Sequence, residues 1–182
     1  MRRSSATRAL ALVATLLVAA CAEMRFLAPG GDAEFELTGR IAVRWRDESS
    51  TGNIAWRHGA RNDEVLITTP LGQGVARIVR EGDAVTLTDA EAREYRAADA
   101  ETLTEQVLGF RLPLAGLADW VRARAGPGPS QVRTGSSGRI AELEQSGWKI
   151  EYLEWGADGR LPARMKLTYP GLELRLAIAE WK

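Results

Sequence analysis

Few side chains of this 182-residue chain are suited to catalysis. His58 is the only histidine and Cys21 the only cysteine, so these residue types cannot supply a Cys/His metal cluster or a histidine-centred triad with a second base. His58 lies beside Gly59 in a predicted turn, and no serine lies in the pattern of a nucleophile elbow. Gly72 and Gly74 lack the third glycine and the following helix of a phosphate-binding loop. The sequence therefore predicts no catalytic residue, no metal site and no cofactor.

Cys21 follows a segment that is typical of a signal peptide. Three arginines within residues 1–8 precede an apolar run over residues 9–20, which is too short to span a bilayer comfortably. The small residues Val18-Ala19-Ala20 before the cysteine resemble the lipobox of bacterial lipoproteins. This resemblance implies cleavage before Cys21, diacylglycerol on its thiol and a third acyl chain on the freed amine. The alternative is an ordinary signal peptide with a chance cysteine.

Three segments follow from this interpretation: a lipoprotein signal peptide (1–20), a lipidated N-terminus and tether (21–32), and a single domain (33–182). The 162 residues after the cleavage site suffice for one domain with a sizeable core. The mature chain keeps 21 basic and 24 acidic side chains, a net charge of −3 that disfavours nucleic acid. No second membrane-spanning candidate follows. Ala22 occupies a place where, in lipoproteins, an Asp tends to retain the protein in the inner membrane, so it indicates the outer membrane.

Alternating apolar and polar residues predict β-strands through the first half of the domain. From Phe35 to Trp45 every second residue is apolar or glycine, which is typical of a strand with one buried face. Gly and Asp residues separate the later runs, so the segment forms an antiparallel meander. The other predictions here are a turn at 47–52 and strands at 53–58, in both arms of a hairpin within 65–79, at 84–88 and at 94–97.

Two short helices interrupt the strands. Asp99 is a predicted N-cap and Gly109 the end of the first helix, with Leu103 and Val107 one turn apart. The second helix begins near Pro113, and its apolar residues fall at helical spacing. Its stripe contains Leu114, Leu117, Trp120 and Val121. The linker 126–129 is followed by predicted strands at 139–145, 148–152, 164–169 and 172–178.

The hairpin within 65–79 has an unusual tip, Pro70-Leu71-Gly72-Gln73-Gly74. Pro and Gly suit a short connection, but hairpin tips usually carry polar residues. Leu71 must therefore fold back onto its own sheet or meet an apolar surface elsewhere. Local packing is the simpler interpretation, because single exposed apolar residues are common.

Many short antiparallel strands with one apolar face tend to curl into a barrel or half-barrel. We therefore predict an α+β, mainly β fold, an unclosed antiparallel half-barrel whose two helices lie against the apolar face. The helices either cover an apolar cavity or complete a solid core.

Together, several short motifs resemble the LolB family of outer-membrane lipoprotein receptors, which is similar in fold to its soluble partner LolA. The resemblance covers nearly all of the mature chain. One departure is Ala123-Arg124, where the family pattern has a glycine after the second helix. The matching motifs are Phe35-x-Leu37-x-Gly39-Arg40, Thr69-Pro70-Leu71-Gly72, Leu103 to Gly109, Leu112-Pro113-Leu114, Leu117-x-x-Trp120, Gly147-Trp148 and Leu161-Pro162.

The resemblance implies an outer-membrane lipoprotein that faces the periplasm, accepts lipoproteins from LolA and inserts them into the inner leaflet of the outer membrane. It implies a monomer that binds acyl chains in an apolar cavity, with no cofactor beyond the lipid on Cys21. The loop Pro70-Leu71-Gly72 is then the membrane-insertion loop. A lipid-anchored binder of another hydrophobic ligand and a structural scaffold lipoprotein are the alternatives. The expected cavity and lid residues are Leu103, Val107, Leu114, Leu117, Trp120, Trp148, Leu174 and Leu176.

Overall fold

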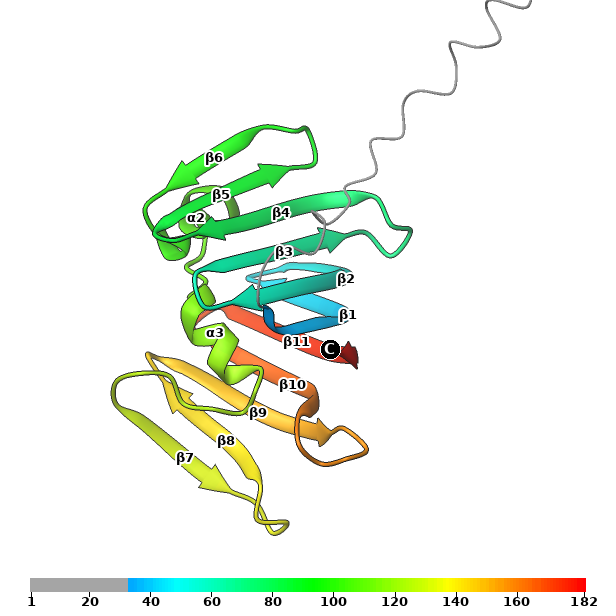
Figure 1. Ribbon diagram of the computed structural model, residues 1–182, viewed down its shortest axis with the longest axis vertical. Helices are drawn as coiled ribbons and strands as arrows, with labels where there is room; N and C mark the ends of the chain where they lie inside the picture. The colour runs from blue at the N-terminus through cyan, green and yellow to red at the C-terminus, as the bar shows by residue number, and fades with distance from the viewer. Residues whose placement is uncertain (1–32) are drawn as a thin grey trace, which may run out of the picture.

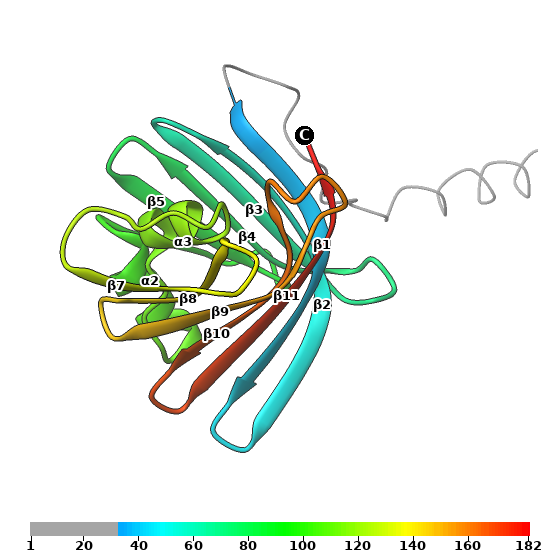
Figure 2. The same cartoon turned by 90° about the horizontal axis from the view of Figure 1, so that it is seen from below.

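The computed structural model describes residues 33–182, which form one curved antiparallel sheet with two short helices on its concave side (Figures 1 and 2). The helices are α2 (Ala100–Leu108) and α3 (Leu114–Trp120). The strands are β1 (Ala33–Trp45), β2 (Glu48–Gly59), β3 (Asn62–Thr68), β4 (Gly74–Glu81), β5 (Ala84–Asp89), β6 (Glu94–Ala97), β7 (Ser130–Thr134), β8 (Ile140–Gln145), β9 (Trp148–Trp155), β10 (Pro162–Tyr169) and β11 (Leu172–Trp181).

The sheet has two free edges. Its strand order is β6-β5-β4-β3-β2-β1-β11-β10-β9-β8-β7, so every neighbouring pair is antiparallel and the first and last strands of the domain pair in the middle. The edge strands β6 and β7 lie at opposite ends of this order. The predicted fold class, an unclosed half-barrel with helices on its apolar face, is confirmed.

The period-2 pattern of β1 places its apolar residues on the concave face. Phe35 and Leu37 are buried there, and the ring of Phe35 meets the edge of Trp181 from β11 at 5.6 Å. The register with β11 shifts between Thr38 and Gly39. A Cβ atom at Gly39 would lie 2.3 Å from the carbonyl oxygen of Ala177, so only glycine fits this bulge.

Helix α2 begins and ends where the sequence predicts, and α3 begins where the sequence predicts but ends at Trp120, before the linker 126–129. The Asp99 carboxylate accepts a 2.7 Å hydrogen bond from the Thr102 N–H, and this bond lowers the pKa of Asp99. Gly109 ends α2 in the left-handed conformation, with φ at 81°. Helix α3 starts after Pro113 and buries the stripe that the spacing predicts.

The strands differ from the sequence predictions at residues 47–52 and 130–134. The turn predicted at 47–52 is shorter, because β2 already begins at Glu48 and pairs with the long β1. The segment after the linker contains an additional strand, β7, which the sequence did not indicate. All five residues of β7 are exposed, so it shows no apolar alternation and is recognised only through its pairing with β8.

At Ala123 the backbone adopts a conformation that would suit the glycine of the family pattern better than alanine. Ala123 follows α3 with φ at 55°, a region in which an L-residue costs about 1–2 kcal/mol and glycine costs little. We predict that Ala123→Gly raises the free energy of unfolding by roughly 0.5–1 kcal/mol, after the extra chain entropy of glycine is subtracted.

Chemical denaturation followed by tryptophan fluorescence measures this effect. Ala125→Gly is the matched control, because Ala125 is exposed two residues later and has no positive φ. Equal or opposite effects of the two substitutions would contradict a conformational cost at Ala123.

Candidate functional site

The concave face and helix α3 enclose an apolar cavity of about 80 Å³. Small-molecule sites in proteins usually measure roughly 300–1,000 Å³, so this cavity is smaller than a typical ligand site. The walls contain no polar side chain other than the indole of Trp56. The lining residues are Ile41, Ile54, Trp56, Val65, Ile67, Ile78, Leu112, Leu114, Leu117, Val121, Leu167, Leu174 and Leu176.

The structure separates the eight residues expected at the cavity into two groups. Leu114 and Leu117 reach the cavity from α3, and Leu174 and Leu176 reach it from β11. The other four pack in the core outside the cavity wall. Leu103, Trp120 and Trp148 are buried there, whereas Val107 is partly buried against them.

Trp120 fixes the C-terminal end of α3 to the sheet. Its indole Nε1 donates a 2.9 Å hydrogen bond to Oε1 of Gln145, and its ring lies 5.9 Å from Trp148. The carbonyl of Trp120 accepts a 2.8 Å hydrogen bond from the Tyr152 hydroxyl. Burial raises the pKa of Tyr152 far above its ordinary value, so the phenol stays protonated and remains a donor.

The N-terminal end of α3 is held more lightly. Leu112, which belongs to a family motif but was not expected at the cavity, donates its N–H to Oγ1 of Thr104 at 2.8 Å. Pro113, at the N-cap position, supplies no side-chain cap. The aromatic and polar side-chain contacts of α3 therefore gather at its Trp120 end.

The loop between β3 and β4 presents Leu71 to solvent. The side chain is 93% exposed, and the loop protrudes from the sheet in both views (Figures 1 and 2). Thr69 holds the loop, since its N–H donates to the Gln73 carbonyl at 2.7 Å and its carbonyl accepts from the Gly72 N–H at 2.9 Å. Gly72 has φ at 90°, which favours glycine. The local packing of Leu71 is therefore excluded in this conformation.

His58 lies in the end of β2 and is buried, not in a turn as the sequence suggested. Its Nδ1 lies 2.6 Å from Oδ1 of Asp63, which also accepts a 2.9 Å bond from Nε1 of Trp56. Arg80 donates to the second carboxylate oxygen at 2.6 Å. The other imidazole nitrogen lies 3.9 Å from the Glu34 carboxylate, so the ring lies between two acidic side chains.

Through Glu34 this network also reaches helix α3. Arg122, two residues after α3, donates to the Glu34 carboxylate at 3.0 Å and stacks its guanidinium over the ring of Phe35 at 5.2 Å. The same side chain donates to the carbonyl of Ala118 inside α3. Arg122 therefore connects the C-terminal end of α3 to Glu34 and Phe35 at the start of β1.

Two further searches concern residues 33–182 alone. No helix in this range is long and apolar enough to cross a membrane. Among the same residues, no group of three or more His, Cys, Asp and Glu side chains is arranged to hold a metal ion.

Fold and site together define a half-barrel protein with an apolar interior under a helical lid. A family model described as outer membrane lipoprotein LolB matches residues 33–181, and the chain belongs to this family. The outer-membrane lipoprotein LolB of Thiobacillus denitrificans is 46% identical over 155 residues, which cover 85% of this chain and 82% of the relative.

Two other proteins are similar over most of their length. The outer-membrane lipoprotein LolB of Chromobacterium violaceum is 34% identical over 182 residues and covers 96% of this chain and 98% of the relative. A LolA-superfamily protein from Nitrosomonas europaea has a solved structure with a TM-score of 0.48 and 14% identity, over 81% of this chain and 84% of the other.

The Asp63 network predicts a pH dependence of stability. Burial raises the pKa of the Asp63 carboxyl, but hydrogen bonds from His58 and Trp56 and the charges of His58 and Arg80 together lower it below its ordinary value. A lowered folded-state pKa stabilises the fold above about pH 4, and this contribution is lost as the pH falls below that value. We predict that in Asp63→Asn the free energy of unfolding falls less as the pH drops below about 4, that is, along the acid limb of its pH profile.

The same substitution leaves Arg80 without its buried counter-charge and should cost roughly 3–5 kcal/mol at neutral pH. Urea unfolding between pH 3 and 7 measures both effects. Asp47→Asn, in an exposed turn, is the control and should leave the acid limb unchanged. An unchanged limb in Asp63→Asn as well would show that this carboxylate does not govern acid unfolding.

Proposed function

We propose that the protein is an outer-membrane lipoprotein that accepts lipoproteins from the periplasmic carrier LolA and inserts them into the outer membrane. One observation carries the proposal. A chain of the LolB family combines an apolar cavity under α3 with a Leu71 that is almost fully exposed. The cavity would shield acyl chains, and the loop would meet the bilayer. Neither role requires a catalytic residue or a nucleotide.

The closed cavity limits how the acyl chains are held. A sixteen-carbon chain gains roughly 10 kcal/mol when it is fully buried, at about 0.8 kcal/mol per methylene. A passive receptor that buried a whole triacyl group would release it too slowly. Partial shielding, with α3 lifted at its Leu114 end, would let the receptor bind the chains better than the carrier does and less well than the bilayer does.

The anchor belongs to the part of the chain before the described residues. We infer that residues 1–20 are the signal peptide, that Cys21 carries the lipid and that residues 21–32 form the tether of the domain 33–182. The relatives that carry the name outer-membrane lipoprotein support this division. We infer that the domain lies on the periplasmic side of the outer membrane as a monomer.

A transfer experiment tests the proposed function directly. LolA loaded with a lipoprotein is mixed with the receptor domain, and the two proteins are separated to see which one holds the cargo. Cargo on the receptor supports the proposal. Cargo that stays on LolA, with a receptor that still binds apolar dyes, would indicate a binder of another hydrophobic ligand. A receptor that holds neither cargo nor dye would indicate a structural scaffold lipoprotein.

The lid geometry predicts which positions touch the cargo lipid. A photo-crosslinking amino acid at Leu117, on the cavity wall, should capture the acyl chains after transfer. The same group at Leu153 should not, because this side chain is 55% exposed and points away from the concave face. Mass spectrometry of the crosslinked products measures the difference. Capture at Leu153 but not at Leu117 would show that the stripe of α3 is only core.

The exposed loop predicts a defect in release alone. Leu71→Glu places a charge at the membrane contact and removes a burial gain of at most roughly 2 kcal/mol, without touching the cavity. Melting temperature and acceptance from LolA should stay nearly unchanged, while transfer of cargo into liposomes should fail. Leu71→Phe and Leu71→Ile should keep release.

Leu153→Glu is the matched control, since it introduces the same charge at another exposed leucine. It should leave release intact. A sharp drop in melting temperature for Leu71→Glu, or loss of acceptance from LolA, would assign Leu71 to packing or to carrier docking.

A further inference from the structure

Two aromatic side chains, Trp45 and Phe110, meet just beyond one end of the cavity, and we call them the aromatic pair. Leu174 lines the cavity, and two residues before it on β11, Leu172 is the register partner of Trp45 on β1. Phe110 belongs to the connection between α2 and α3, two residues before the cavity residue Leu112. The two rings lie 5.4 Å apart. The aromatic pair therefore forms the next layer beyond the cavity wall, at the end of β1.

Few bonds hold the aromatic pair in place. Both side chains are only partly buried. Within residues 33–182, Nε1 of Trp45 has no hydrogen-bond partner, whereas Nε1 of Trp120, at the other end of α3, is hydrogen-bonded. In the same range, no hydrogen bond joins the backbone of Phe110 to another residue. A Cβ atom at Gly109 would lie 3.7 Å from Nε1 of Trp45, so glycine leaves room beside this nitrogen. Separating the two rings would break a ring contact but no hydrogen bond of theirs.

A cation without an acidic partner lies next to the aromatic pair. Arg46, in the turn after β1, is exposed and holds its guanidinium over the Trp45 ring at 5.1 Å. It forms no ion pair with any residue that the structure describes. Its backbone N–H donates to the Gly171 carbonyl at 3.0 Å, where the β1–β2 and β10–β11 hairpins end side by side (Figure 2). The backbone of Arg46 is therefore fixed, while its charge stays available.

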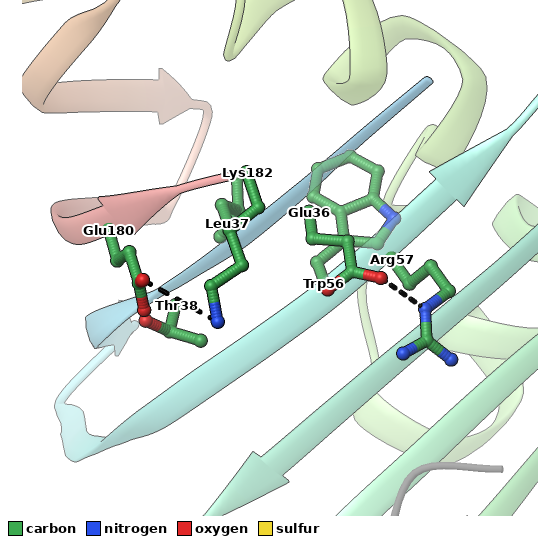
Figure 3. A pocket seen from close by; sticks show the side chains of 7 residues that line it. All are labelled: Glu36, Leu37, Thr38, Trp56, Arg57, Glu180 and Lys182. Atoms are coloured by element: carbon green, nitrogen blue, oxygen red, sulfur yellow. Dashed lines mark hydrogen bonds and ion pairs between the residues drawn. The ribbon is translucent and has the colours of Figure 1, made fainter. Parts of the chain in front are cut away.

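A pocket on the outer face of the sheet shows the opposite arrangement (Figure 3). It measures about 30 Å³ and lies between β11, β1 and β2. Its cations are already paired, because Arg57 donates to Glu36 at 2.7 Å and Lys182 lies 3.5 Å from Glu180. At the aromatic pair, by contrast, an indole N–H and a guanidinium are both unused and lie beside an apolar cavity.

These unused donors fit a ligand with an apolar tail and a head that carries oxygen atoms. The tail would meet apolar walls inside the cavity, and the head, at the cavity's end, would accept hydrogen bonds from the two donors. A bond from a charged donor such as a guanidinium is stronger than one between neutral groups. An acyl chain, with its ester or carboxylate oxygens, has this chemistry.

We propose that Trp45, Arg46 and Phe110 form the mouth of the cavity. An acyl chain enters there as the Phe110 ring leaves the Trp45 ring. Nε1 of Trp45 and the guanidinium of Arg46 then bind its ester or carboxylate oxygen. The methyl end of the chain points along β2 toward Trp56, which lines the cavity farther from the mouth. The inference rests on the proposed function for the source of the chain, which is the cargo lipoprotein.

Stopped-flow mixing with a fluorescent fatty acid, dansyl-undecanoic acid, tests the entry route. The protein is the chain from residue 21 with Cys21→Ala, so that no lipid of its own competes for the cavity. Phe110→Ala should raise the rates of binding and release about fivefold, because one aromatic contact is lost. Trp155→Ala is the control, since Trp155 is also partly buried and lies 6.0 Å from Tyr152 at the far end of β9. It should leave both rates unchanged.

Equilibrium titration with the same fatty acid tests the head-group contacts. Arg46→Gln removes the charge and should weaken fatty-acid binding about fivefold, while the affinity for N-phenylnaphthylamine, which has no carboxylate, stays unchanged. Trp45→Phe keeps a ring but removes the N–H donor, so it should act in the same direction. Arg139→Gln is the matched control, because Arg139 is exposed and lies over the Trp155 ring at 5.5 Å. It should change neither affinity.

Two results would overturn the mouth. Rates in Phe110→Ala and Trp45→Ala that equal those of Trp155→Ala would place the entry elsewhere. Equal losses of fatty-acid affinity in Arg46→Gln and Arg139→Gln would show that no head group is bound at Arg46. The melting temperature of each variant identifies any that has lost its fold, and the other variant of the same test then decides.

Transfer from LolA to the same variants identifies the source of the chain. Slower transfer of lipoprotein to Arg46→Gln than to Arg139→Gln supports a cargo ester at the mouth. Cargo that stays on LolA with every variant, while the fatty-acid effects appear as expected, would support the mouth and count against the proposed function. An effect confined to uptake of fluorescent phospholipid, from vesicles of phosphatidylethanolamine and phosphatidylglycerol, would overturn the role of the mouth in cargo transfer.

Discussion

The strength of acyl-chain burial constrains this protein more than any other interaction. Full burial of one sixteen-carbon chain is worth roughly 10 kcal/mol, and a receptor that must give the chain up can realise only part of that. The cavity of about 80 Å³ fits this constraint because it is too small to hold a whole chain with α3 closed. If the cavity takes up acyl chains as proposed, their entry would displace the α3 side chains, and the core contacts that α3 loses would reduce the net affinity for the chain.

The distribution of polar bonds around α3 follows from the same requirement. Trp120, Tyr152 and Arg122 gather hydrogen bonds at one end of the helix, while Pro113 leaves the other end without a side-chain cap. A helix held at both ends would keep the cavity shut, and one held at neither end would expose the apolar face to water. One fixed end would suit the partial opening that the proposed function requires.

The Leu71 loop is organised differently, because backbone hydrogen bonds within the loop hold its shape. The backbone bonds of Thr69 and the left-handed Gly72 set the tip in place. If Leu71 enters a bilayer as proposed, little conformational entropy would then be lost, which matters for a contact worth only about 2 kcal/mol. A short pre-ordered hairpin suits a brief encounter with the membrane better than a flexible loop.

Much of the fold could be predicted from the sequence because its signals are local. The alternation in β1, the N-cap Asp99 and the C-cap Gly109 each act within a few residues. Strand β7 lacks such a signal, since its side chains are exposed on both faces and only β8 defines it. The Asp63 network joins residues brought together by strand register, and the division of the α3 stripe depends on where Gln145 lies in β8.

The open edges of the sheet also affect how far its curvature can change. Strands β6 and β7 end the sheet at opposite ends of its order, so no ladder of hydrogen bonds joins them across the opening. A closed barrel of fixed strand number and shear has a fixed radius, whereas an open sheet can flatten by small changes of twist between neighbours. Because its two edge strands are not joined, this sheet is not held to one radius, and its curvature can change while every strand keeps its partners.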